Sequence, residues 1–200
     1  FGLFSFYQYA TRYEKENKVL KEIIERLTAD SRIAEVLVSD VSYDPLLNKH
    51  KTTIKFLEYD SKGHPLKPQY FTFFGNIIQF QSIVVRFDDF YVKNGDNLRG
   101  KSAYLFRKVF FLDGANTQEY EITRVNEIPE GYKIEGNTNS YEVKFWTRFW
   151  EYALNPRLAQ SNGIKNAQIE APGTKFIPGM IYTIKIEHAG GMRIDASPIP

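Results

Sequence analysis

Residues 180–195 read MIYTIKIEHAGGMRID, and this segment is the clearest indication of the fold class. Apolar and polar residues alternate on both sides of Gly190-Gly191, as they do in β-strands whose successive side chains point to opposite faces. A pair of glycines between two alternating runs is typical of a hairpin turn, because glycine adopts positive φ without strain. The segment therefore predicts an antiparallel hairpin.

Similar patterns upstream predict further strands, each bounded by turn residues such as Gly, Pro, Asn and Asp. We expect these strands at residues 33–41, 52–59, 70–74, 77–92 and 103–112. Their spacing favours an antiparallel sandwich or barrel. The expected fold class is α+β and mainly β, with one aromatic-rich helix and a long N-terminal helix ahead of the strands.

The aromatic-rich helix is expected at residues 140–154, where aromatic residues recur at steps of three and four before an Asn-Pro stop. Core packing accounts for one face of this helix, which includes Phe145. The adjoining face carries Trp and Arg, the usual anchors of protein interfaces. We therefore expect an exposed partner-binding surface formed by Trp146, Arg148 and Trp150.

The N-terminal helix shows a heptad pattern over residues 3–34, in which every d position is apolar or aromatic. Charged residues lie between these positions, with Glu14 and Lys18 at the i,i+4 spacing that stabilises helices. A lone polar Asn17 at an a position is typical of parallel coiled coils, where it fixes register and oligomer number. We expect this helix to self-associate through Phe6, Tyr13, Asn17, Leu20, Ile24 and Leu27.

Two domains are expected: a helical stalk at residues 1–32 and one β-rich globular domain at residues 33–200. The alternative to a self-associating stalk is a single amphipathic helix lying on the β domain, because Ile23 beside Ile24 widens the apolar stripe. The chain starts with apolar and aromatic residues and turns charged at Arg12, as a transmembrane helix does at its headgroup end. We therefore expect a membrane anchor upstream, with a core helix or a signal-peptide remnant as the alternatives.

Composition weighs against several function classes. The 26 basic and 24 acidic residues give a net charge of +2, so nucleic acid is not an expected partner. The chain has no Cys, which excludes thiolate zinc sites and cysteine nucleophiles. Its three histidines, His50, His64 and His188, are far apart in the sequence, and we expect no metal site. Neither a phosphate-binding glycine loop nor a Gly-x-Ser-x-Gly motif occurs, so no cofactor is expected.

Catalysis is left open by the sequence, which favours a non-enzymatic role. The adjacent carboxylates Asp88 and Asp89, flanked by aromatic residues, could line a carbohydrate groove and divide acid and base roles between them. A glycan-binding or glycan-cleaving module that uses these carboxylates with Trp146 and Trp150 is therefore the alternative function.

A resemblance to a known group is carried by the C-terminal part of the chain. The residues that carry it are Phe145-Trp146-x-x-Phe149-Trp150-x-Tyr152-Ala153-x-x-Pro156, Gly163-Ile164-x-x-Ala167-x-x-Glu170-Ala171 and Pro178-Gly179-x-x-Tyr182. This arrangement resembles uncharacterised bacterial exported proteins that carry an N-terminal membrane anchor. The resemblance implies an anchor in the bacterial inner membrane and a head in the periplasm. It supplies no catalytic residues.

Together these features favour a non-catalytic bacterial envelope scaffold or assembly protein. Its expected partners are other copies of the same chain and another envelope protein, with the membrane reached through the upstream segment. The stalk would set the spacing of the heads, and several linked copies would strengthen each contact through effective concentration.

Overall fold

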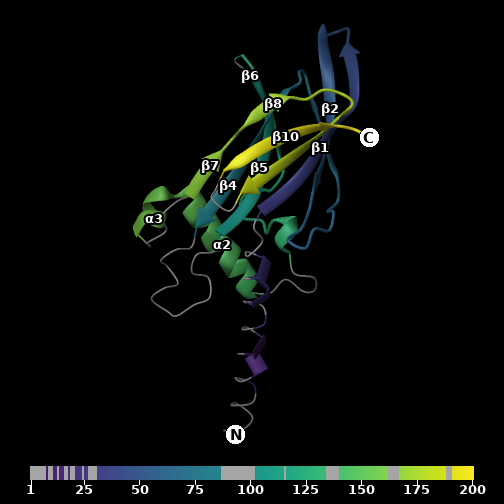
Figure 1. The fold of residues 1–200 in the computed structure, drawn as a ribbon. Coiled ribbons are helices and arrows are strands. Elements are labelled where there is room, and N and C mark those ends of the chain that lie inside the picture. The colour runs from purple at the N-terminus through teal and green to yellow at the C-terminus, as the bar shows by residue number, and fades with distance from the viewer. Residues whose placement is uncertain are drawn as a thin grey trace.

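A computed structural model describes residues 31–86, 102–114, 116–133, 140–161, 167–187 and 191–200, together with scattered positions between residues 8 and 26. The described part consists mainly of β-strands in two antiparallel sheets, with few helices (Figure 1). The predicted class, α+β and mainly β, is confirmed.

The first sheet has five strands, and its outer strands at one side are the C-terminal hairpin. Met192 pairs with Ile186 in that hairpin, as residues 180–195 predict. In spatial order the strands are β10 (Met192–Pro198), β9 (Met180–Glu187), β1 (Ser31–Asp44), β2 (Lys49–Glu58) and β3 (Gln69–Phe73).

The second sheet is built around β4 (Ile77–Arg86) and β5 (Ser102–Asp113), which are antiparallel neighbours. At one edge β6 (Asn116–Glu121) pairs with β5. At the other, β7 (Ala167–Glu170) and β8 (Gly173–Lys175) both pair with β4, one after the other along its length. The strand predicted at residues 77–92 is described as far as Arg86, and its remainder lies outside the described residues.

Side chains of both sheets meet in one hydrophobic core. Phe56 of the first sheet is 1% exposed, and its ring lies 5.6 Å from Phe80 and 5.4 Å from Phe106 of the second. Burial of one such ring stabilises the fold by about 1.5–3 kcal/mol. Alternation along β2 explains the arrangement, because every second residue from Thr52 to Glu58 is buried.

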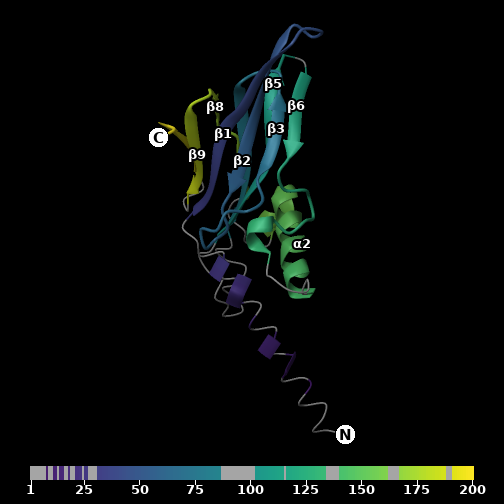
Figure 2. The same cartoon turned by 90° about the vertical axis from the view of Figure 1, so that its right-hand side faces the viewer.

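The other face of the second sheet is covered by helices. α2 (Ser140–Leu154), α3 (Pro156–Ser161) and the short 3-10 helix η2 (Glu130–Tyr132) pack there around a second hydrophobic cluster. The middle of β4 is therefore buried on both faces, which explains its continuous apolar run at residues 83–85. Figures 1 and 2 show α2 near the end of the sheets opposite the β1–β2 turn.

The described positions between residues 8 and 26 are helical. All six residues expected to form the coiled-coil contact, Phe6, Tyr13, Asn17, Leu20, Ile24 and Leu27, lie outside the described residues, so the long helix and its self-association stay predictions. Ile23 is described and buried in the same cluster as Tyr132 and Trp146. The Arg26 guanidinium donates a hydrogen bond to the carbonyl oxygen of Lys133. These contacts attach the end of the N-terminal segment to the head. The alternative interpretation, a single amphipathic helix lying on the β domain, likewise requires Ile23 to be buried against the head.

Candidate partner-binding surface

The β1–β2 hairpin extends beyond the second sheet and ends in an apolar turn (Figure 2). The Asp44 carboxylate accepts hydrogen bonds from the backbone N–H groups of Leu46, at 3.0 Å, and Leu47, at 3.2 Å. Asn48 closes the turn with φ of 51°, a conformation that asparagine tolerates better than most residues. Leu46 is 94% exposed and Leu47 is 54% exposed. The fold therefore holds two leucines in water on a hydrogen-bonded turn.

A β-bulge in β1 decides which side chains line the inner side of this hairpin. The pairing register shifts between Val38 and Asp40. Before the shift, Val36 faces the core opposite Phe56; after it, Val41 lies opposite Thr52, which is 3% exposed. Directly opposed residues share a face of the sheet, so the bulge turns Val41 inward. Without it, the alternation would send Val41 to the outer face.

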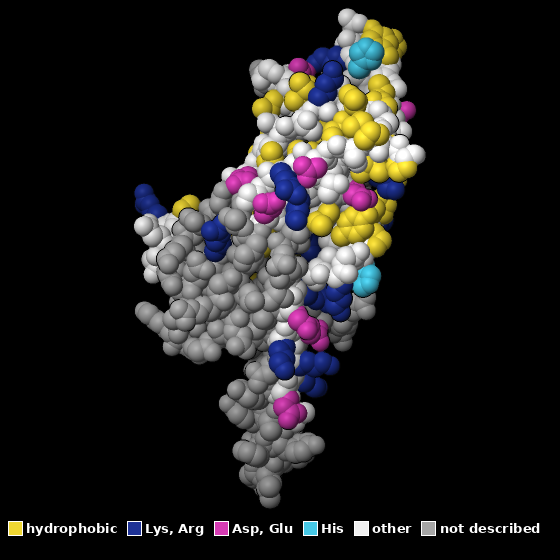
Figure 3. Space-filling view, in the orientation of Figure 1, with side chains coloured by type: hydrophobic (Ala, Val, Ile, Leu, Met, Phe, Trp, Pro, Cys, Tyr) yellow, Lys and Arg dark blue, Asp and Glu magenta, His cyan; other side chains and the backbone are white. Residues whose placement is uncertain are grey.

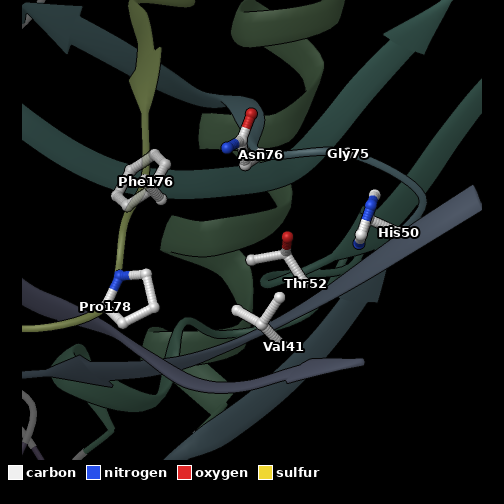
Figure 4. Close-up of a pocket in the computed structure, with 7 residues that line it drawn as sticks. All are labelled: Val41, His50, Thr52, Gly75, Asn76, Phe176 and Pro178. Carbon is white, nitrogen blue, oxygen red and sulfur yellow. The ribbon is translucent and has the colours of Figure 1, made fainter. Parts of the chain in front are cut away.

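A cavity of about 400 Å³ opens where the inner side of the hairpin passes the end of the second sheet. We call it the hairpin cleft. It is lined by Val41, His50, Thr52, Gly75, Asn76, Phe176 and Pro178 (Figure 4).

The wall at Phe176 is fixed from the core. Its ring lies 4.4 Å from Tyr182 and 5.9 Å from Phe80. The Phe176 N–H donates to the carbonyl oxygen of Asn76 at 2.7 Å. The Tyr182 hydroxyl donates to the Lys175 carbonyl at 3.0 Å and accepts from the Ile177 N–H at 2.9 Å. The cleft is therefore held in shape by the packed interior.

Exposed apolar side chains line the cleft or follow its lining residues in the chain. Apart from the turn leucines, Val41 is 49% exposed, Ile77 is 61% exposed and Ile177 is 42% exposed. Figure 3 shows hydrophobic side chains gathered over the end of the molecule that carries the hairpin. Contiguous exposed apolar side chains with a polar border mark interaction sites.

Two lysines near the turn of the hairpin, Lys49 and Lys51, are paired with carboxylates. Lys49 forms an ion pair with Asp113, and Lys51 forms one with Asp44 at 2.6 Å. The hydrogen bond from Lys51, together with those from the turn amides, holds the pKa of Asp44 below its ordinary value. The surface is therefore suited to an uncharged, apolar contact rather than to an anion.

The two tryptophans expected at an exposed surface are buried, and that prediction is wrong. Trp146 is 2% exposed and Trp150 is fully buried. The Trp146 ring lies 5.0 Å from that of Tyr132, and the Trp150 Nε1–H donates to the Glu127 carbonyl oxygen at 2.8 Å. The second sheet covers one side of α2, and the segment that ends at η2 covers the adjoining side. The described aromatic side chains of the helix are therefore all buried. These indoles offer no stacking surface for a sugar ring; Arg148, the third residue, is exposed.

The remaining candidates are dispersed. Asp88, Asp89 and His188 lie outside the described residues. His50 lines the hairpin cleft, whereas the His64 Nδ1 lies 3.2 Å from an oxygen of the Asp60 carboxylate in the turn after β2. Among the residues that the structure describes, no three potential metal ligands form a group. Within that same part of the chain, no helix is long and apolar enough to cross a membrane.

The hairpin cleft is the surface that sequence analysis missed. Its residues come from β1, β2, the β3–β4 turn and the segment before β9, and none of these carries a motif. The one available signal was the pair of leucines in the Pro45–Asn48 turn, where polar residues are the rule. Comparison of the chain with models of protein families, with curated proteins and with solved structures gives no significant match.

Proposed function

We propose that the protein is a non-catalytic envelope scaffold or assembly protein, which self-associates and binds a protein partner. The observation that carries the proposal is the apolar hairpin, whose turn leaves Leu46 94% exposed and whose strands line one side of a preformed cleft. Holding leucine in water has no benefit for folding, whereas covering it with a partner removes apolar surface from water at about 25 cal/mol per Å².

The chemistry of the cleft favours a protein as the partner. Its volume of about 400 Å³ is near the lower end for ligand sites, which suits one or two apolar side chains. Val41, Phe176 and Pro178 supply apolar walls, and His50 and Asn76 supply polar groups. An aliphatic or aromatic side chain of the partner would enter the cleft, while Leu46 and Leu47 would pack against the surface beside it.

The arrangement of the head fits an anchored protein. We infer that its two sheets are the layers of a sandwich, because Phe56 contacts rings of the opposite sheet directly. The described N-terminal positions and the β1–β2 turn are at opposite ends of the molecule (Figure 1). A stalk that continues from a bacterial inner-membrane anchor would therefore present the hairpin away from the membrane, in the periplasm.

Photo-crosslinking in cells tests the proposed partner surface. A crosslinking amino acid replaces Leu46 in the whole protein, and Tyr70 on β3, which is 59% exposed, serves as the matched control position. We expect one discrete adduct with another envelope protein from position 46 and none from position 70. The adduct should disappear with Leu47→Asp, which leaves the melting temperature within about 1–2 °C because the side chain is half exposed. Equal adducts from both positions, or none, would contradict the proposal.

Light scattering tests the proposed self-association. We expect the chain to form a defined oligomer that becomes monomeric when residues 1–30 are removed. Because Ile23 lies in the buried cluster of the head, circular dichroism checks that the truncated head is folded. Asn17→Leu should raise the thermal stability of that oligomer and broaden the distribution of its size, because a buried polar a position restricts oligomer number at a cost in stability. The exposed substitution Lys18→Ala is the control. A monomer at all concentrations, with and without residues 1–30, would exclude the stalk contact.

A further inference from the structure

Among the residues that the structure describes, β10 has no neighbouring strand on its outer side, and the hairpin register shows which backbone groups lie along this free edge. The Glu187 N–H donates to the Gly191 carbonyl oxygen at 2.7 Å, and Cα partners then run in order from Met192 opposite Ile186. Hydrogen-bonded and non-hydrogen-bonded pairs alternate along an antiparallel ladder. Arg193 and Asp195 therefore bond to β9, whereas the backbone groups of Ile194 and Ala196 point outward.

Two further residues agree with this alternation. The Met192 N–H, which the register directs outward, donates to the Glu170 carboxylate at 2.7 Å rather than to β9. Pro198, which has no N–H, falls at another outward position. No strand of the described part pairs with the outward groups of Ile194 and Ala196.

The side chains of β10 separate by charge. Met192 and Ile194 pack against the hydrophobic core on one face. Arg193 and Asp195 are exposed on the other face, where Arg193 Nε lies 2.9 Å from Asp195 and Nη1 lies 3.1 Å from Glu187. The free edge thus carries one positive and one negative side chain, two residues apart, on either side of Ile194.

We propose that the β10 edges of two copies of this chain pair antiparallel about a two-fold axis at Ile194. In this register Ile194 lies opposite Ile194 of the second copy and exchanges N–H···O bonds with it. Arg193 of each copy then lies opposite Asp195 of the other, on the same face. The Ala196 N–H donates to the Met192 carbonyl of the other copy, and the Met192 N–H keeps its bond to Glu170.

Other registers are less favourable. An axis at Arg193 or Asp195 places like charges opposite each other and requires backbone groups that already bond to β9. An axis at Ala196 places Pro198, which cannot donate, opposite Ile194. The edge is therefore self-complementary in one register, which is the property that a symmetric contact requires.

The β10 contact rests on the proposed function only because it requires copies of the chain to associate. It goes beyond the proposed function by naming a contact between the heads. A contact of so few residues is weak on its own.

Disulfide formation between two single-cysteine chains tests the register. The chain has no Cys, so the background is zero. Full-length Arg193→Cys and Asp195→Cys chains, one of them tagged, are mixed under mild oxidation. Opposed residues of a non-hydrogen-bonded pair have Cα atoms about 4.5 Å apart, within the range that a disulfide spans. We expect the mixed disulfide to form about tenfold faster than either homodimeric disulfide. Equal rates for the three products, or no disulfide, would overturn the proposal.

Charge reversal tests the pairing by a second route. Asp195→Arg should weaken head-to-head association about tenfold, because it opposes like charges in both cross-strand pairs. Combining it with Arg193→Asp should restore association. Glu119→Lys, which reverses a charge on the edge strand of the other sheet, is the matched control and should change nothing.

The two proposals fail separately. If the chain is monomeric by light scattering but forms the mixed disulfide at high concentration, the β10 contact is supported and the stalk contact is excluded. If the oligomers depend on the stalk but the mixed and homodimeric disulfides form at equal rates, the stalk contact is supported and the β10 contact is excluded.

Discussion

Replacing Trp150 with alanine is expected to destabilise the head by about 3–5 kcal/mol, the usual cost of removing a buried tryptophan or phenylalanine ring. Trp150 is fully buried, and its ring lies 5.5 Å from that of Phe149. The substitution also leaves the Glu127 carbonyl oxygen without the indole N–H that it accepts at 2.8 Å. Urea denaturation, followed by circular dichroism, measures the loss.

A matched substitution on the same helix separates core packing from helix propensity. Val143 of α2 is 45% exposed, and Val143→Ala should change the free energy of unfolding by less than about 0.5 kcal/mol. Weaker association with unchanged unfolding in Trp150→Ala would restore Trp150 as an interface anchor and contradict its burial.

Glu58→Ala is expected to cost about 3–5 kcal/mol, because it leaves the charge of Arg32 buried without its partner. Arg32 is 1% exposed and Glu58 is 8% exposed, and the two form an ion pair inside the head. Burial disfavours the charge on Arg32, but Glu58, Tyr132 and Asp60 together outweigh it and hold the pKa of the guanidinium above its ordinary value. The guanidinium carbon lies 4.6 Å from the centre of the Tyr132 ring. Urea denaturation at neutral pH measures the effect.

Two controls identify the mechanism. Glu121→Ala removes the partner of Arg107 in a pair on the surface, and should cost no more than about 1 kcal/mol. Arg32→Met combined with Glu58→Leu removes both charges and should be much less harmful than Glu58→Ala alone. If Glu58→Ala and Glu121→Ala cost the same, the charge of Arg32 would not be isolated from water.

Gly131 shows how closely this ion pair is enclosed. A Cβ added at Gly131 would lie 1.8 Å from Nη2 of Arg32, so only glycine leaves room for the guanidinium there. The Arg32 Nη1 also lies 3.4 Å from the Gly131 carbonyl oxygen, to which it donates. The pair thus links the start of β1 to η2, next to Lys133, whose carbonyl accepts from Arg26. No local pattern predicts this arrangement, because the three segments that carry Arg32, Glu58 and Gly131 are far apart in the chain.

Local patterns predicted the elements whose neighbours lie close in the sequence. The hairpin of β9 and β10 and the bounds of α2 match the expected ranges closely, because alternation, helical period and turn residues act over a few positions. β6 and β8 were missed. β6 reads NTQEYE and is almost wholly exposed, and β8 has three residues, so their pairing with longer strands defines them rather than any apolar pattern.

Local patterns in the chain were enough to predict the mainly antiparallel β architecture and its aromatic-rich helix, and composition excluded cysteine chemistry. Which apolar side chains are covered depends on contacts between distant segments. Trp146 and Trp150 are buried because segments distant in the sequence pack against α2. Leu46 is exposed to water because the β1–β2 hairpin extends beyond the end of the second sheet. Hydrophobicity is a property of each residue, but burial depends on which non-local segments reach it, and a single sequence does not encode that contact in any local pattern.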